Sequence, residues 1–292
     1  MFTRRDFGRL MTATLASGVF TPSGLKAQPQ NMGKGSPQFS VMMWTLRDRG
    51  SFEENLERVA QAGYHHVELV NEFKKWTEED TRRILARMQA LGISVDAMAG
   101  MTTGFADPSG GEAFLSELKG LIPVAQRLQS DQIILLSGKR IEGVSREDQH
   151  AASVATLKRA AELLHAAGIV GVIEPIDRLE NPSIYLDGVN EAFEIVRAVG
   201  SPNIKVLYDL YHEQRESGNL IEKLDKNIDE VGLIHIADVP GRHEPGTGEV
   251  NYGNIYRKLA KLNYKGVIAM EFYPTGDVVE TLRRAREEAL VS

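Results

Sequence analysis

The strongest constraint on the fold is an alternation of short apolar runs with longer amphipathic stretches along most of the chain. The runs are rich in Val, Ile, Leu and Met, which is typical of strands buried on both faces. They occupy residues 39–44, 65–70, 93–98, 132–137, 170–175, 204–209, 232–238 and 266–272. Strands of this kind that alternate with helices pair in parallel. Eight such units in about 250 residues predict a single (β/α)8 barrel.

The stretches between the runs have the periodicity of helices with one buried face. Those at 51–63, 77–92 and 188–200 end in glycine, a residue that commonly terminates a helix. The alternative is an open, doubly wound sheet, but its Gly-x-Gly-x-x-Gly signature does not follow the run at 39–44. The pattern therefore favours the closed barrel over the open sheet.

The N-terminus has the composition of an export signal. Thr3-Arg4-Arg5-Asp6-Phe7 is followed by an apolar run from Leu10 to Phe20 and by the small residue Ala27. The segment resembles a twin-arginine signal, and a disordered basic tail is the alternative. The run is too short to span a hydrocarbon core of about 30 Å, so no membrane anchor is expected. We predict a signal at 1–27, a linker at 28–37, a catalytic barrel at 38–292 and export to the periplasm.

Charge and cysteine content limit the possible partners and chemistry. The net charge is −6, and the basic residues near the N-terminus leave the rest of the chain more acidic still. An acidic surface argues against a nucleic-acid partner, whose phosphates require basic side chains. The chain has no cysteine, which excludes disulfides, a thiolate nucleophile and thiolate metal ligands.

Polar side chains end four consecutive apolar runs. They are Glu174, Asp209, His235 and Glu271. In a barrel these side chains would converge at one end, where three carboxylates would repel one another strongly. A divalent cation would relieve that repulsion, and ligands that offer only oxygen and nitrogen suit Mn2+, Mg2+ or Co2+. Taken singly, each of the four is as readily a helix cap, an ion-pair partner or a hydrogen-bonded core residue.

Two connections, at 99–111 and 238–254, are longer than a barrel needs. Both follow the carboxyl end of an expected strand, the end at which barrel enzymes build their sites. They suggest a cover over a substrate, with surface decoration as the alternative. Of two further strand-end residues, Glu68 could reach the site, but an ion pair outside it is favoured. Trp44 is expected either to wall the pocket or to lie in the core.

Several stretches resemble a known group of enzymes. "IEPID" at 173–177, "YDLYH" at 208–212, "GLIHIADVPGRHEPGTGEVNYGNI" at 232–255 and "MEFYP" at 270–274 resemble the xylose-isomerase-like superfamily of sugar isomerases and epimerases, and in particular the hydroxypyruvate isomerase family. The resemblance covers the chain from about Phe39 to the last helix. It implies a (β/α)8 barrel and a divalent-metal cofactor.

The resemblance also implies roles for individual residues. It makes Glu174, Asp209, His235 and Glu271 the metal ligands, and Glu174 and Glu271 also the acid and base. Related ketose 3-epimerases hold their substrate with residues at positions that correspond here to Glu180, His212 and Arg242. Three alternatives stay open: His212 orienting Asp209, Arg242 pairing with Glu244, and Glu180 as an ordinary loop charge.

The expected function is metal-dependent isomerisation of a small α-hydroxycarbonyl compound through an enediolate, as in the conversion of hydroxypyruvate to tartronate semialdehyde. The alternatives are a ketose 3-epimerase or related keto-sugar-processing enzyme and a non-catalytic sugar-binding barrel. A metal-dependent endonuclease of the same superfamily is disfavoured by the acidic chain. The expected partner is a small hydroxycarbonyl or sugar substrate, and a homo-oligomer is left open.

Overall fold

The computed structural model of the protein describes residues 37–291. The predicted export signal at 1–27 lies outside the described residues, as does the predicted linker up to residue 36. Within residues 37–291, none of the helices combines the length and apolar composition needed to cross a bilayer.

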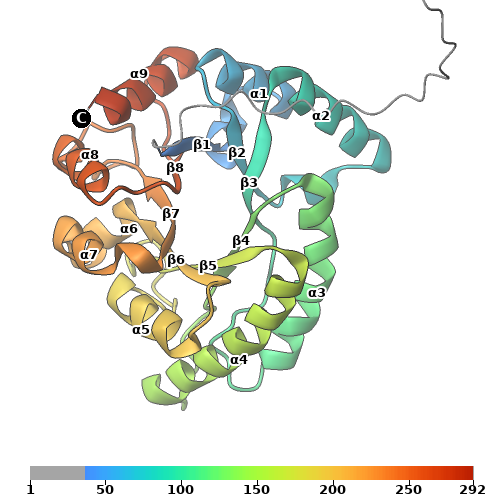
Figure 1. Ribbon diagram of the computed structural model, residues 1–292, viewed down its shortest axis with the longest axis vertical. Helices are drawn as coiled ribbons and strands as arrows, with labels where there is room; N and C mark the ends of the chain where they lie inside the picture. The colour runs from blue at the N-terminus through green and yellow to red at the C-terminus, as the bar shows by residue number, and fades with distance from the viewer. Residues whose placement is uncertain (1–36, 292) are drawn as a thin grey trace, which may run out of the picture. The chain divides into compact units, whose positions relative to one another are not determined.

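Eight parallel strands close into a barrel in chain order, with helices around the outside (Figure 1). The strands are β1 Gln38–Met42, β2 His66–Val70, β3 Ser94–Ala99, β4 Gln132–Leu136, β5 Val170–Glu174, β6 Ile204–Asp209, β7 Val231–Ile236 and β8 Val267–Met270. β1 pairs in parallel with both β2 and β8, which closes the ring. The prediction of a single (β/α)8 barrel is confirmed.

The described helices follow the strands. They are α1 Phe52–Gln61, α2 Glu78–Leu91, α3 Gly111–Leu128, α4 Arg146–Ala167, α5 Val189–Val199, α6 Leu210–Glu216, α7 Leu220–Asn227, α8 Tyr252–Lys261 and α9 Val278–Val291. Short 3-10 turns lie at Met43–Arg49, Glu72–Lys75 and Ile228–Glu230. The apolar run at 39–44 is therefore not all strand, because β1 stops at Met42 and Trp44 lies in the turn that follows.

Side-chain hydrogen bonds fix where several helices begin and end. Ser51 caps α1 in a reciprocal arrangement with Glu54, and Thr77 does the same for α2 with Asp80. Each side chain satisfies backbone N–H groups that the first turn of a helix leaves without partners. These caps set the points at which the outer helices start against the barrel.

The apolar core has two layers, one between the strands and the helices and one inside the barrel. The inner layer consists of Met42, Ala97, Ile134, Val172, Leu207, Leu233, Val267 and Ala269. Side chains alternate between the two faces of a strand, so the residue two places further along also points inward. Glu174, Asp209, His235 and Glu271 stand two places beyond Val172, Leu207, Leu233 and Ala269, respectively. The inward polar residues therefore form the next layer, at the carboxyl end of the strands.

Candidate metal centre

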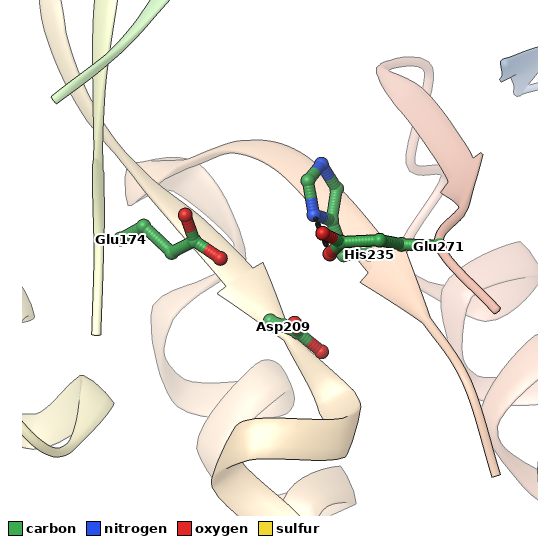
Figure 2. Close-up of side chains that lie close together, drawn as sticks. All are labelled: Glu174, Asp209, His235 and Glu271. Carbon is green, nitrogen blue, oxygen red and sulfur yellow. Dashed lines mark hydrogen bonds and ion pairs between the residues drawn. The ribbon is translucent and has the colours of Figure 1, made fainter. Parts of the chain in front are cut away.

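Glu174, Asp209, His235 and Glu271 come together at the carboxyl end of the barrel (Figure 2). One ligand atom from each lies within 4.8 Å of the others, and all four residues are buried. Glu174 and Asp209 end β5 and β6, His235 lies in β7, and Glu271 directly follows β8. Figure 2 shows Glu174 approaching from one side and the pair of Glu271 and His235 from the other, with Asp209 between them.

Burial and mutual charge shift the protonation of the two glutamates in opposite directions. Burial and the nearby charge of Glu271 raise the pKa of Glu174 to about 7. Burial alone would also raise the pKa of Glu271, but the positive charges of Arg242 and His235 hold it well below its usual value. The negative charge of the cluster is therefore offset mainly at Glu271.

His235 is held at both ring nitrogens. Nδ1 lies 2.6 Å from Oε2 of Glu271, and Nε2 lies 2.8 Å from Oε2 of Glu68, a residue of β2 on another part of the barrel wall. Burial lowers the pKa of His235, and the two carboxylates reverse that effect and raise it above its ordinary value. The expectation that Glu68 forms an ion pair outside the site is wrong, because Glu68 points inward and reaches His235.

The two carboxylate oxygens of Asp209 have different roles: one caps a helix and the other lies in the cluster. Oδ1 accepts the backbone N–H of Tyr211 at 2.8 Å and so caps α6. Oδ2 is buried and makes no hydrogen bond, although His212 Nε2 lies 3.3 Å away and Arg242 Nη2 lies 3.6 Å away. A buried carboxylate oxygen without a hydrogen-bond donor is costly unless a cation compensates it. Together with the oxygen and nitrogen donors around it, this oxygen fits a divalent cation.

Arg242 supplies a positive charge beside the cluster. Its Nη2 lies 3.0 Å from Oε2 of Glu271, and its Nη1 lies 3.0 Å from Oε1 of Glu180. The guanidinium carbon lies 5.3 Å from the ring centre of Trp44 and 4.9 Å from that of Tyr211. Arg242 is thus fixed between two aromatic rings and two carboxylates, which holds one long side chain in a single place.

Arg242 does not pair with Glu244. The carboxylate of Glu244 instead accepts from the backbone N–H and the hydroxyl of Thr275 and lies 3.5 Å from Arg284. This contact ties the loop after β7 to the loop after β8. Trp44 packs against the inner apolar layer and also reaches the site, since its Nε1 donates to Oε1 of Glu271 at 3.1 Å.

The other two predicted substrate residues lie next to the four. His212 Nε2 is 4.0 Å from Oε1 of Glu174, and its Nδ1 is 2.7 Å from Oδ2 of Asp177, which holds the ring in place. Glu180 is 42% exposed and lies between Arg242 and Arg215, with 3.0 and 3.2 Å contacts. The structure thus brings Glu180, His212 and Arg242 to the rim of the cluster.

Asp238 organises the long loop that follows β7. This fully buried carboxylate accepts the backbone N–H groups of Val239, Gly246, Gly248 and Val250, at 2.9 to 3.0 Å. Sequence reasoning missed this role, although a polar residue directly after an apolar run, followed by a loop rich in glycine, is a signal for it. The loop that carries Arg242 is therefore folded around one carboxylate.

Comparison with known proteins places this fold and site. Residues 56–289 match the family described as xylose isomerase-like TIM barrel. The chain is 31% identical over 242 residues to the hydroxypyruvate isomerase of Escherichia coli (strain K12). The alignment covers 81% of this chain and 93% of that protein. It is 28% identical over 249 residues to the 2-oxo-tetronate isomerase of Cupriavidus necator. That alignment covers 82% of this chain and 93% of the relative.

Among solved structures, the chain is similar to the protein described as AP endonuclease, family 2, from Brucella melitensis. The TM-score is 0.77 at 25% sequence identity, over 85% of this chain and 97% of the other. The fold and the inward polar layer define a (β/α)8 barrel with a buried cluster of carboxylates and histidine. The chain belongs to the xylose isomerase-like TIM barrel family and, within it, to the hydroxypyruvate isomerase family.

Asp209→Asn is expected to weaken divalent-cation binding while leaving α6 capped, because asparagine caps a helix as well as aspartate does. The dissociation constant for Mn2+, measured by isothermal titration calorimetry, should rise by more than about tenfold, since a ligand charge is lost. Asp277→Asn is the matched control, because Asp277 also accepts a backbone N–H, from Glu280, but lies outside the cluster. Equal Mn2+ binding by wild type and Asp209→Asn would contradict the assignment.

Asp238→Asn is expected to destabilise the loop after β7. The amide has one accepting oxygen in place of two, so buried backbone N–H groups lose their acceptor, and the free energy of unfolding should fall by about 3 kcal/mol or more. Urea unfolding measures this. Glu249→Gln changes an exposed contact of the same loop, with Gln214, and should stay within about 0.5 kcal/mol of wild type. A similar small effect for Asp238→Asn would refute the organising role.

Proposed function

We propose that the protein is a divalent-metal-dependent isomerase of a small α-hydroxycarbonyl compound, closest in reaction to the conversion of hydroxypyruvate to tartronate semialdehyde. The observation that carries the proposal is the placement of two carboxylates, Glu174 and Glu271, on opposite sides of one buried cluster (Figure 2). The similarity to relatives named hydroxypyruvate isomerase and 2-oxo-tetronate isomerase supports the isomerase class.

The proposed cofactor is a divalent cation held by Glu174, Asp209, His235 and Glu271. Mn2+ or Mg2+ suits this donor set best, and Co2+ is also compatible. When bound, such a cation would polarise the substrate carbonyl and stabilise the negative charge that develops when a neighbouring C–H bond is broken.

The two glutamates are proposed to move the protons. One carboxylate removes a proton from the hydroxyl-bearing carbon, and the electron pair forms the carbon–carbon double bond of an enediolate. The other returns a proton to the former carbonyl carbon, while the hydroxyl proton shifts to the former carbonyl oxygen. Trp44 Nε1 and Arg242 Nη2 hold the two oxygens of Glu271, so this carboxylate keeps a fixed orientation during the transfer.

The rim residues are proposed to orient the substrate. His212, braced by Asp177, presents Nε2 toward the cluster, and Arg242 presents its guanidinium beside Glu271. These donors can hydrogen-bond to the oxygens of a substrate, and Glu180 can accept from a hydroxyl group. Burial of the cluster keeps bulk water from the reacting carbon, which limits loss of the transferred proton.

Deuterium exchange tests the proposed chemistry directly. Metal-loaded protein incubated in D2O with hydroxypyruvate and a panel of ketoses should place deuterium on a carbon beside the carbonyl of its substrate, as seen by NMR. Glu174→Gln and Glu271→Gln should lower the exchange rate by about 10²- to 10⁴-fold, because each removes one acid or base. A chelator should stop the exchange.

Glu249→Gln is the matched control for both substitutions and should exchange at the wild-type rate. The product separates the reactions: a proton returned to the neighbouring carbon gives an isomer, and one returned to the other face of the same carbon gives an epimer. Unchanged exchange in both glutamine variants, or none with any substrate in metal-loaded wild type, would contradict the proposal.

We also propose that the chain is exported to the periplasm through the twin-arginine pathway, on the basis of Arg4-Arg5 and the apolar run that follows. Arg4→Lys together with Arg5→Lys should leave the protein in the cytoplasm, as measured by cell fractionation and immunoblotting. A wild-type chain found uncleaved in the cytoplasm would refute export.

A further inference from the structure

Glu68 is a buried carboxylate that the proposed reaction does not use. It belongs to β2 and is 0% exposed, and its side chain crosses the inside of the barrel to the ring of His235 in β7. The distance from Oε2 of Glu68 to Nε2 of His235 is 2.8 Å. The other neighbour of Glu68 is the carboxyl group of Asp96 in β3, and Oε1 of Glu68 and Oδ2 of Asp96 are both buried.

The position of Glu68 is costly for a barrel interior. A buried carboxylate loses much of its hydration free energy, and a second buried carboxyl group beside it adds to the cost. Asp96 of β3 lies close enough that burial and the charge of Glu68 raise the pKa of Asp96 well above its ordinary value. An apolar side chain of similar volume would avoid the loss of hydration and the repulsion of Asp96. The contact with His235 is therefore the interaction that explains a carboxylate at this position.

The contact fixes which nitrogen of His235 faces the cluster. An ionised carboxylate only accepts hydrogen bonds, so the nitrogen beside Glu68, Nε2, carries a hydrogen. Nδ1 faces the carboxylate of Glu271 in the same way, so its lone pair is available to a cation once the hydrogen on Nδ1 is lost while Nε2 keeps its own. Because Glu68 holds the ring at Nε2, His235 presents Nδ1 as a possible metal ligand on the side of Glu174, Asp209 and Glu271.

We propose that Glu68 is the positioning residue of the metal centre: it holds the His235 ring with Nδ1 toward the cluster and so sets the affinity of the site for a divalent cation. The inference rests on the proposed metal-dependent function. Carboxylates that hold a ligating histidine from behind orient the ring and increase its strength as a ligand.

Metal titration of Glu68 variants tests the inference. The dissociation constant for Mn2+, measured calorimetrically on the full chain after removal of metal by a chelator, should rise by about 10- to 100-fold in Glu68→Leu. Glu68→Gln should give a value between wild type and Glu68→Leu, because the amide oxygen still accepts from Nε2 but carries no charge.

Glu191→Gln is the matched control. It changes a half-buried carboxylate that contacts a histidine outside the cluster, His150, and should leave Mn2+ affinity within about twofold of wild type. Thermal unfolding of each metal-free variant establishes whether it is folded. If Glu68→Leu does not fold, Glu68→Gln carries the test.

A second readout reports the hydrogen bond itself. In Co2+-loaded protein, the Nε2 proton of His235 should appear as a paramagnetically shifted proton signal that exchanges slowly with water, because the nitrogen is buried and bonded to Glu68. In Glu68→Leu the same proton should exchange faster. A purely structural role of Glu68 would not change this signal in a folded variant.

Two outcomes separate the inference from the function on which it rests. If wild type and folded Glu68→Leu bind Mn2+ equally tightly, or show the same Nε2 proton exchange, the positioning role is refuted while the metal-dependent function stands. If wild type binds neither Mn2+ nor Co2+, the proposed function fails and the inference fails with it.

Discussion

The repulsion among buried carboxylates at the carboxyl end of the barrel is the interaction that the surrounding structure must offset. Glu174, Asp209 and Glu271 stand at the carboxyl ends of β5, β6 and β8 with apolar side chains directly beneath them, where carboxylates repel one another strongly. The chain offsets part of this charge with Arg242, whose guanidinium reaches Glu271 and Asp209. Because Arg242 comes from a loop and not from a strand, the stability of the site depends on how that loop is held.

Two buried carboxylates hold the loop after β7, and neither faces the cluster. Asp238 gathers four backbone N–H groups of the loop, and Glu244 joins it to Thr275 in the loop after β8. The backbone at Arg242 adopts φ 56°, a left-handed conformation that costs a residue with a side chain about 1 to 2 kcal/mol. Its N–H donates to the carbonyl of Asp238 and its carbonyl accepts from Tyr273, so backbone contacts on both sides offset that cost.

The sequence predicts at which end of the barrel the site residues lie better than it predicts which side chains contact one another across the barrel. Strand alternation and barrel closure are enough to bring Glu174 and Asp209 to one end, because every parallel strand ends on the same side. The partnership of Glu68 with His235 depends on the register across β2 and β7, which are not adjacent strands, and no local pattern encodes it. Trp44 was ambiguous for a related reason: β1 ends two residues earlier than its apolar run, and the turn that follows directs the ring to Glu271.

The counter-charges are distributed unevenly, and this distribution argues for a cation. Glu271 has contacts with Arg242, His235 and Trp44, whereas Glu174 has one ion-pair contact in the described structure, with His212 at 4.0 Å. The protein thus neutralises one side of the cluster with its own side chains, while Glu174 has a single distant partner and Oδ2 of Asp209 makes no hydrogen bond. A buried site of this kind favours protonation of one carboxyl group, as the pKa of about 7 for Glu174 indicates, or the binding of a positive ion. Binding a divalent cation would displace that proton, so the structure links occupancy of the centre to the charge state of one of the two carboxylates proposed to move protons.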